Sequence, residues 1–119
     1  MRILVCGGRD FDDWHELHCR LTEFTQEKGY STTEVVIMTG DACGADWLAR
    51  AWSKWEGIKY LGFPADWKKH GKAAGGIRNQ QMLDEGKPDL VIAFPGGVGT
   101  ADMVRRSRKA GVKVIEVAR

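Results

Sequence analysis

The sequence predicts an α/β fold, a three-layer sandwich in which about four helices cover both faces of a five-stranded parallel sheet. Five short apolar segments alternate along the chain with four longer segments of helical periodicity. The apolar segments are nearly continuous, as in strands that are buried on both faces. A strict alternation of strand and helix favours parallel strands joined by crossover helices.

Length and composition restrict the class of protein. With 119 residues we expect one domain over 1–119, and 43% hydrophobic with 29% charged residues is typical of a globular chain. The net charge of +2 is too small for bulk attraction to nucleic acid or membranes, and no apolar run approaches the roughly 20 residues that span a bilayer. Three scattered cysteines suit a reducing compartment, so we expect a cytoplasmic protein.

The first half of the chain predicts three strands and two helices. The strands are expected over 2–6, 34–39 and 58–63, and the helices over 14–28 and 45–56. Each helix has recognisable ends and an apolar face. The first is capped by Asp12 or Asp13 and ends before a left-handed Gly29. The second is expected to end at Gly57, and its inward side chains are Leu48, Trp52 and Trp55.

The second half begins with a polar, glycine-rich segment, 64–76, which has no clear periodicity and can form a lid. A helix over 77–85, a strand over 89–94, a helix over 101–110 and a strand over 112–117 follow. Right-handed crossovers then leave two orders for the sheet, a Rossmann-like 3-2-1-4-5 or a flavodoxin-like 2-1-3-4-5.

One glycine-rich turn, Phe94 to Thr100, lies between a predicted strand and a predicted helix. Glycines let the backbone approach a ligand, and the amide groups of a helix N-terminus favour anions. We therefore predict a phosphate or carboxylate site here. Its predicted members are Pro95, Gly96, Gly97, Gly99 and Thr100.

Three other loops follow strands and are expected at the same edge of the sheet, 7–13, 40–46 and 64–76. In a 3-2-1-4-5 sheet the first of them flanks the same crevice as the glycine-rich turn. Arg9 can hold a phosphate there, although pairing with Asp10 or Asp12 is the alternative. The spacing G-x-G-x-x-G is absent, which argues against a standard dinucleotide site.

Two acidic residues, Asp41 and Asp46, flank the start of the second helix. One is expected to be an N-cap, more readily Asp41, and the other is then free to accept ribose hydroxyls or to transfer protons. Arg78 and Asn79 lie at the front of the third helix. An arginine in a first helical turn opposes the helix dipole, which indicates an anionic partner, with a solvated arginine as the alternative.

The remaining candidates have simpler explanations. The group His15, His18 and Cys19 is too small for a zinc site, and Cys6 and Cys43 are expected to be buried thiols. No metal or cofactor is predicted.

The basic residues near the end of the last helix complement its dipole, with nucleic-acid contact as the minor alternative. Some tryptophans exceed the needs of a core and suit a subunit interface or stacking on a base. These are Trp14, Trp47 and Trp67.

Six segments of the chain together resemble the SLOG superfamily, which includes DNA-processing protein A and the Lonely Guy (LOG) phosphoribohydrolases. Within it the sequence looks most like the small stand-alone YspA/YpsA-related branch. The resemblance implies a Rossmann-like fold, for which we expect the order 3-2-1-4-5. It also implies binding of a nucleotide or nucleotide-derived ligand, often by a homodimer or larger homo-oligomer. The segments are 7–11, 40–46, 65–67, 71–75, 78–82 and 95–100.

The resemblance also implies a set of site residues. Catalytic roles fall on Arg78, Asp102 and Asp46. Ligand or phosphate binding falls on Gly7, Gly8, Arg9, Gly40, Asp41, Gly44, Asn79, Pro95, Gly96, Gly97, Gly99 and Thr100.

This chain departs from the hydrolase patterns of LOG enzymes at two positions. In R-K-x-x-M, Arg78 and Met82 match but Asn79 replaces the lysine. In P-G-G-x-G-T-x-x-E, Met103 stands at the glutamate position, and the adjacent Asp102 is rotated by about 100° on a helix.

Three hypotheses for function follow. The first is a nucleotide-binding protein that hydrolyses the N-glycosidic bond of its ligand. The second is a nucleotide sensor without catalysis, and the third, less favoured, is a single-stranded DNA-binding protein.

Overall fold

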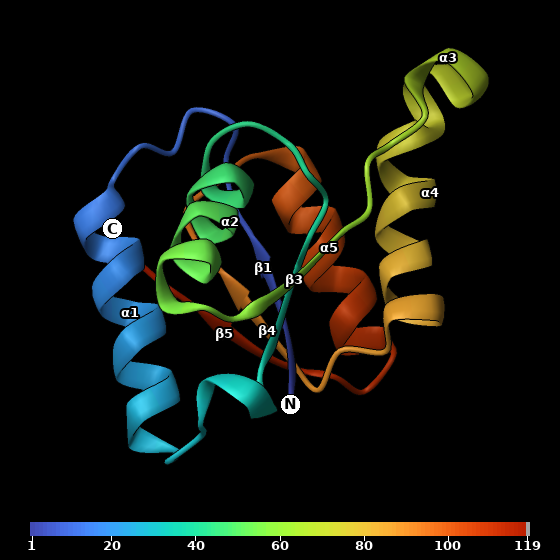
Figure 1. Cartoon of the computed structure of the whole chain (residues 1–119). Coiled ribbons are helices and arrows are strands. Elements are labelled where there is room, and N and C mark those ends of the chain that lie inside the picture. Colours follow the sequence, from blue (N-terminus) through green and yellow to red (C-terminus); the bar gives the residue numbers. More distant parts are fainter. Residues whose placement is uncertain (119) are drawn as a thin grey trace.

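The computed structural model describes residues 1–118, in which five parallel strands form one sheet in the order β3-β2-β1-β4-β5 (Figure 1). This is the predicted Rossmann-like order. The central strand β1 pairs with both β2 and β4, and Leu4 lies opposite Met38 on one side and Val91 on the other. The strands are β1 (Arg2–Cys6), β2 (Val36–Thr39), β3 (Lys59–Gly62), β4 (Leu90–Ala93) and β5 (Lys113–Glu116).

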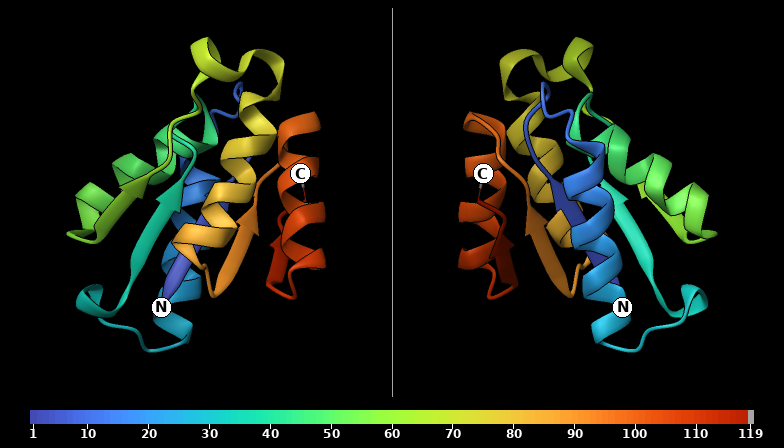
Figure 2. Two further views of the ribbon diagram at one scale, coloured as in Figure 1. Left: turned by 90° about the vertical axis from the view of Figure 1, so that its right-hand side faces the viewer. Right: turned by 90° about the vertical axis from the view of Figure 1, so that its left-hand side faces the viewer.

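Two pairs of helices cover the two faces of the sheet (Figure 2). On one face lie α1 (Trp14–Glu27) and α2 (Ala45–Glu56), and on the other α4 (Ala74–Gln81) and α5 (Val98–Lys109). Successive strand residues point to opposite faces. Ile3 therefore packs in the α1/α2 cluster, which includes Leu17 and Trp52, whereas Leu4 packs in the α4/α5 cluster, which includes Met82 and Met103.

The ends of α1 and α2 largely agree with the sequence. The Asp13 carboxylate accepts a hydrogen bond of 3.0 Å from the Glu16 amide, and Gly29 and Gly57 both have left-handed φ angles, +70° and +71°. The inward assignment of Trp55 is wrong, because its side chain is 78% exposed. The buried face of α2 contains Trp52, and three residues further along a helix the side chain is rotated about 60° off that position.

The segment 64–76 has more structure than its sequence pattern indicates. It contains the short helix α3 (Trp67–His70), whose first turn is capped by the Asp66 carboxylate through the Lys69 amide at 3.1 Å. A 3₁₀ turn, η2 (Gly71–Ala73), leads directly into α4, which begins at Ala74 and not at residue 77. Figures 1 and 2 show α3 projecting beyond the carboxyl ends of the strands.

The early start of α4 depends on its packing against α5. The helix continues through Gly75 and Gly76 because it packs against α5, where a Cβ at Gly76 would lie 3.1 Å from Nη2 of Arg106. Close helix packing here offsets the low helix propensity of glycine. After Gln81 the chain forms one π-helical turn, η3 (Met82–Gly86), and a short 3₁₀ turn, η1 (Thr32–Glu34), precedes β2.

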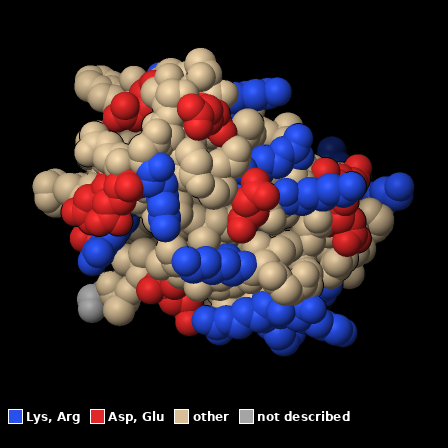
Figure 3. Space-filling model, turned by 90° about the horizontal axis from the view of Figure 1, so that it is seen from below, with Lys and Arg blue, Asp and Glu red and all other residues tan. Residues whose placement is uncertain are grey.

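The surface below the sheet, near the amino ends of the strands, carries both signs of charge (Figure 3). Lysine and arginine side chains alternate there with aspartate and glutamate. Within residues 1–118 none of the helices is long and apolar enough to cross a bilayer.

Candidate functional site

A cavity of about 1060 Å³ opens at the carboxyl ends of the strands. The loops after β1, β2 and β4 and the α3–α4 segment all contribute to its wall, as the parallel sheet requires. Most of the site residues predicted from the sequence line it. These are Gly7, Gly8, Arg9, Gly40, Asp46, Arg78, Asn79, Gly97, Gly99, Thr100 and Asp102.

Asp41 and Gly44 lie outside the lining of this cavity. The Asp41 carboxylate accepts a hydrogen bond from the Tyr60 hydroxyl on β3. Its predicted role as the N-cap of α2 is wrong, because Gly44 holds that position without a side-chain cap. Gly44 has φ +77°, and a Cβ there would lie 2.6 Å from the carbonyl carbon of Arg9. Glycine at this position therefore lets the start of α2 pack directly against the backbone of the β1–α1 loop.

Pro95 and Gly96 also lie outside the lining and join two loops together. The Gly8 amide donates to the Pro95 carbonyl at 2.9 Å. A Cβ on Gly96 would lie 2.6 Å from the Gly8 nitrogen and would overlap Oγ1 of Thr100. Glycine at position 96 therefore lets the β1–α1 and β4–α5 loops approach each other closely enough to form a common wall.

The first turn of α5 faces the cavity. Gly97 is the N-cap and provides no side chain, and Val98, Gly99 and Thr100 line the wall. The first amide groups of a helix have no acceptor within the helix, and the helix dipole makes this end positive. A Cβ built on Gly97 or Gly99 meets no protein atom within 4 Å. No side chain at 97 or 99 narrows this end of the helix, which leaves room for an anion beside it.

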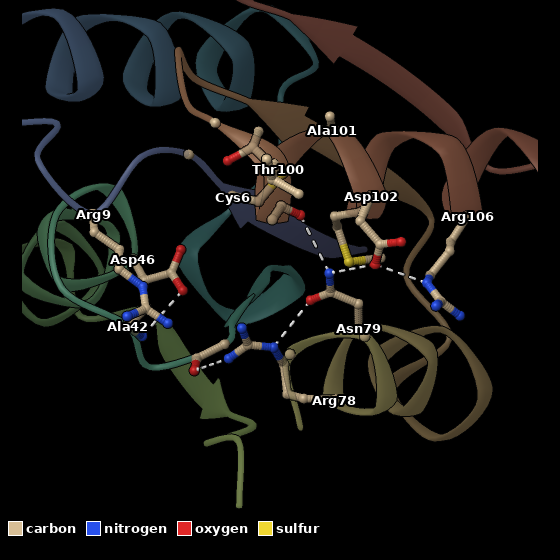
Figure 4. A pocket seen from close by; sticks show the side chains of 18 of the residues that line it. Cys6, Arg9, Ala42, Asp46, Arg78, Asn79, Thr100, Ala101, Asp102 and Arg106 are labelled. Carbon is tan, nitrogen blue, oxygen red and sulfur yellow. Dashed lines mark hydrogen bonds and ion pairs between the residues drawn. The ribbon is translucent and has the colours of Figure 1, made fainter. Parts of the chain in front are cut away.

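Arg78 projects into the opposite wall from the second turn of α4, and not from a first turn as predicted (Figure 4). Its Nη1 donates to the Gly40 carbonyl at 2.5 Å, and its Nε donates to Oδ1 of Asn79 at 3.0 Å. Burial lowers the pKa of Arg78, and the charge of Arg9 acts in the same direction against the attraction of Asp46. These two hydrogen bonds orient the guanidinium, and no residue of 1–118 accepts a hydrogen bond from its Nη2.

Asn79 is almost fully buried and connects Arg78 to α5. Its Nδ2 donates to Oδ2 of Asp102 at 3.0 Å and to the Gly99 carbonyl at 3.3 Å. The side-chain oxygen and both amide hydrogens therefore have partners within the protein. Although Asn79 lines the cavity, its polar atoms are committed to holding the two helices together.

Asp102 is the acceptor for three neighbouring side chains. Asn79 donates to it, Nε of Arg106 lies 2.8 Å from Oδ2, and Arg105 pairs with Oδ1. Burial acts to raise the pKa of Asp102, but the hydrogen bonds from Asn79 and Arg106 and the charges of both arginines outweigh it. The pKa therefore lies below its ordinary value, and the group is a carboxylate at neutral pH.

Asp46 has the opposite environment. It is 6% exposed and accepts a hydrogen bond of 3.1 Å from the Ala42 amide. Burial raises its pKa to about 6, although that hydrogen bond and the charge of Arg78 act to lower it. The cavity thus contains one carboxyl group whose pKa is raised by burial and one whose pKa is lowered by its hydrogen-bond and ion-pair partners.

Arg9 lies over the ring of Trp67, with its guanidinium carbon 5.3 Å from the ring centroid. The alternative of an ion pair with Asp10 or Asp12 is not formed within residues 1–118. Both Arg9 and Trp67 line the cavity.

The base of the cavity is apolar and includes Cys6, Met82 and Met103. Burial raises the pKa of the Cys6 thiol far above its ordinary value, so Cys6 is an inert buried thiol, as predicted. Cys43, predicted to be buried as well, is exposed in the loop before Gly44.

Arg105 and Arg106 also line the cavity, whereas the sequence indicated a complement to the helix dipole or, as the minor alternative, nucleic-acid contact. Their spacing of three and four residues from Asp102 is the signal that indicates ion pairs on one helix face. Lys72 lines the cavity as well, and it lies in the segment 64–76 but is not among the site residues predicted from the sequence.

Comparisons with known proteins agree with this fold. The chain is 37% identical over 123 residues to the Gene 61 protein of Mycobacterium phage D29, covering 96% of this chain and 94% of that protein. The structure of the Moco carrier protein from Chlamydomonas reinhardtii is similar in fold, with a TM-score of 0.66 and 19% identity over 98% of this chain and 75% of that one.

A family profile matches residues 1–70, the part that carries β1 to β3 and the Gly7–Asp10 and Gly40–Asp46 loops. The α4–α5 wall of the cavity, with Arg78, Asn79 and Asp102, lies beyond this match. By this profile, which covers more than half of the chain, the chain belongs to the YspA, cpYpsA-related SLOG family.

Proposed function

We propose that the protein binds a nucleotide or nucleotide-derived ligand, with its phosphate at the first turn of α5. The observation that carries this proposal is the open N-terminus of α5, which faces Arg78 across one cavity. Gly97 and Gly99 leave the amides accessible, and the Thr100 hydroxyl adds a donor.

Charge supports an anionic ligand. Arg78 is half-buried and donates to the Gly40 carbonyl and to the side-chain oxygen of Asn79, and to no carboxylate within residues 1–118. Arg9 has no ion pair within residues 1–118, and its charge opposes that of Arg78. A phosphate between these side chains and α5 relieves this repulsion and accepts charge-assisted hydrogen bonds.

The test compares Gly97→Leu with Ala51→Leu. A Cβ at position 97 meets no protein atom within 4 Å, so the variant is expected to fold and to fill the space of the phosphate. Ala51 is exposed on α2, outside the cavity, and serves as the matched control. A thermal-shift screen against nucleoside mono-, di- and triphosphates is the measurement.

A ligand at 100 times its dissociation constant stabilises the fold by about 2.7 kcal/mol. We expect this stabilisation in the wild type and in Ala51→Leu but not in Gly97→Leu. Equal nucleotide affinity in a folded Gly97→Leu protein contradicts the proposal, and so does a screen in which no nucleotide stabilises the wild type.

A second candidate function is hydrolysis of the N-glycosidic bond of the bound nucleotide. The observation in its favour is the pair of cavity carboxyl groups with pKa values displaced in opposite directions, Asp46 upward and Asp102 downward. Asp46 can exchange a proton with water or with the leaving base, and the ionised Asp102 can stabilise positive charge on the ribose.

Other features favour binding without catalysis. Met103, at the glutamate position of the LOG pattern, is 1% exposed and packs in the core, and Asp102 already neutralises two arginines. To decide between hydrolysis and binding without catalysis, the protein is incubated with AMP for a long time and free adenine is measured by chromatography. Adenine release that is lost in Asp46→Asn supports hydrolysis, whereas saturable binding without release supports a sensor.

Single-stranded DNA binding has less support. In the basic group near the end of α5, Arg105 and Arg106 pair with Asp102, and Arg108 pairs with Glu116 at 2.9 Å. Oligonucleotide affinity that falls steeply as salt rises is the result that favours this function.

The homodimer implied by the resemblance stays a prediction. Trp47 and Trp55 on the outer face of α2 are 59% and 78% exposed and are the residues to test. The measurement is molar mass by light scattering for the wild type and for Trp47→Glu/Trp55→Glu. A dimeric wild type with a monomeric variant supports an interface on α2.

A further inference from the structure

We propose that Trp67 and Arg9 form the subsite that receives the base of the nucleotide, as a stacking platform at the rim of the cavity. This inference rests on the proposed function, because it assigns the part of the ligand that lies beyond the phosphate. It names the chemical class recognised there, a planar aromatic ring.

The position of Trp67 is built by its neighbours along the chain. It is the first residue of α3, and the Asp66 carboxylate caps this short helix. Cη2 of its ring lies 3.5 Å from the position of a Cβ on Gly75, which is van der Waals distance, so the ring packs over the start of α4. The ring is thereby held at the cavity although the side chain is 48% exposed.

Arg9 is held from the other side of the opening. The Gly8 carbonyl accepts hydrogen bonds from the amides of Phe11 and Ala45, and the Gly8 amide donates to Pro95. These bonds connect the β1–α1 loop to both adjacent loops. The Arg9 guanidinium therefore lies over the Trp67 ring from an anchored backbone, with no carboxylate partner within residues 1–118.

Nucleobases stack well on aromatic rings, such as an indole, and on the planar guanidinium of arginine. A base can stack on the exposed face of the pair, or it can displace Arg9 and stack on the indole, leaving the guanidinium to the phosphate. Both geometries extend the ligand from the first turn of α5 toward α3. Since stacking increases with ring area, we expect a purine to bind more tightly than a pyrimidine.

The other exposed tryptophans have different surroundings. Trp47 and Trp55 lie on α2 outside the cavity, and Trp14 packs against His18 with ring centroids 5.7 Å apart. Among the large exposed aromatic residues of 1–118, Trp67 is the one that lines the cavity.

The test separates the base from the phosphate by comparing AMP, CMP and ribose 5-phosphate by calorimetry. Ribose 5-phosphate carries the same phosphate and sugar without a base. The proteins are the wild type, Trp67→Ala, Trp67→Phe and the control Trp47→Ala. Stacking on an aromatic side chain corresponds to a factor of about 5 to 150 in affinity.

We expect Trp67→Ala to weaken AMP binding by that factor and to leave ribose 5-phosphate within twofold of the wild type. Trp67→Phe should retain most of the AMP affinity, AMP should bind the wild type more tightly than CMP, and Trp47→Ala should change none of these values. Circular dichroism and melting without ligand establish that the variants fold. If Trp67→Ala alone is unfolded, the comparison of Trp67→Phe with Trp47→Phe replaces it, with a smaller but selective loss expected for AMP.

Two outcomes overturn the subsite and leave the proposed function intact. One is unchanged AMP binding in Trp67→Ala, and the other is an equal loss for AMP and ribose 5-phosphate, which indicates a structural effect on the whole site. If the wild type binds none of the three compounds, the proposed function fails, and the subsite fails with it.

Discussion

Nδ2 of Asn79 lies 3.0 Å from Oδ2 of Asp102, and this contact joins α4 to α5 at the wall of the cavity. The same Asn79 side chain orients Arg78 through Nε. The buried side chain of Asn79 therefore holds both Arg78 and Asp102 at the cavity. The lysine of the LOG pattern has no acceptor oxygen, so it could not accept the hydrogen bond from Arg78 that asparagine accepts here.

Replacement of Asn79 by alanine should destabilise the protein by about 1–3 kcal/mol, because Arg78 and the Gly99 carbonyl each lose a partner in a half-buried site. Urea unfolding at pH 7 measures this, and we expect one cooperative transition for a single domain. The control Gln81→Ala, at an exposed position near the end of the same helix, should change stability by less than about 0.5 kcal/mol. Equal values for the two variants contradict the assigned role.

Replacement of Asp46 by asparagine should stabilise the protein at pH 7. The pKa of Asp46 is about 6 in the folded state against an ordinary value of 3.8, so the folded state binds this proton more tightly than the unfolded state. Stability is therefore lost as pH rises from about 4 through 6, by roughly 2–3 kcal/mol in total.

The variant keeps an oxygen that can accept from the Ala42 amide but has no charge to bury. Urea unfolding from pH 4 to 8 should show a flatter pH dependence for Asp46→Asn than for the wild type. Parallel curves for the two proteins contradict the burial of an ionisable Asp46.

Replacement of Gly40 by alanine should weaken AMP binding by displacing Arg78. A Cβ at position 40 would lie 2.6 Å from Cζ of Arg78 and even closer to Nη1. Since a charge-assisted hydrogen bond contributes about 1.5–3 kcal/mol, we expect a loss of about ten- to 150-fold, similar to that of Arg78→Ala.

The double variant Gly40→Ala/Arg78→Ala supplies the control. If Gly40→Ala acts through Arg78, it should have no further effect in the Arg78→Ala background. Additive losses in calorimetric titrations with AMP indicate a separate role for Gly40.

Replacement of Met103 by glutamate, which completes the LOG pattern, should destabilise the protein by more than about 3 kcal/mol at pH 7. Met103 is 1% exposed among apolar neighbours, where an ionised carboxylate has no partner. The loss should be smaller at pH 4–5, because the introduced group is then protonated. Met103→Leu keeps volume and polarity and should cost less than about 1.5 kcal/mol. A stable Met103→Glu variant that releases adenine from AMP contradicts this expectation.

The strands, the glycine-rich loops and a large part of the cavity lining are predictable from local sequence. Continuous apolar segments such as 2–6 form strands because burial on both faces of a sheet favours them, and glycine clusters end them. The crossover rule then left two strand orders, and in either order the loops gather at one edge. For this reason Gly8, Arg9 and Gly97, which follow two different strands, line one cavity.

Tertiary packing decided the rest. The sequence left open which of Asp41 and Asp46 faces the cavity. The Asp41 carboxylate accepts a hydrogen bond from the Tyr60 hydroxyl on β3, 19 residues away, and lies outside the cavity. The α4–α5 contact extends α4 back to Ala74 through two glycines and pairs Asn79 with Asp102 across 23 residues. Burial of Asp46 raises its pKa. Periodicity reports which face of an element is apolar, whereas pairing and desolvation depend on which elements meet.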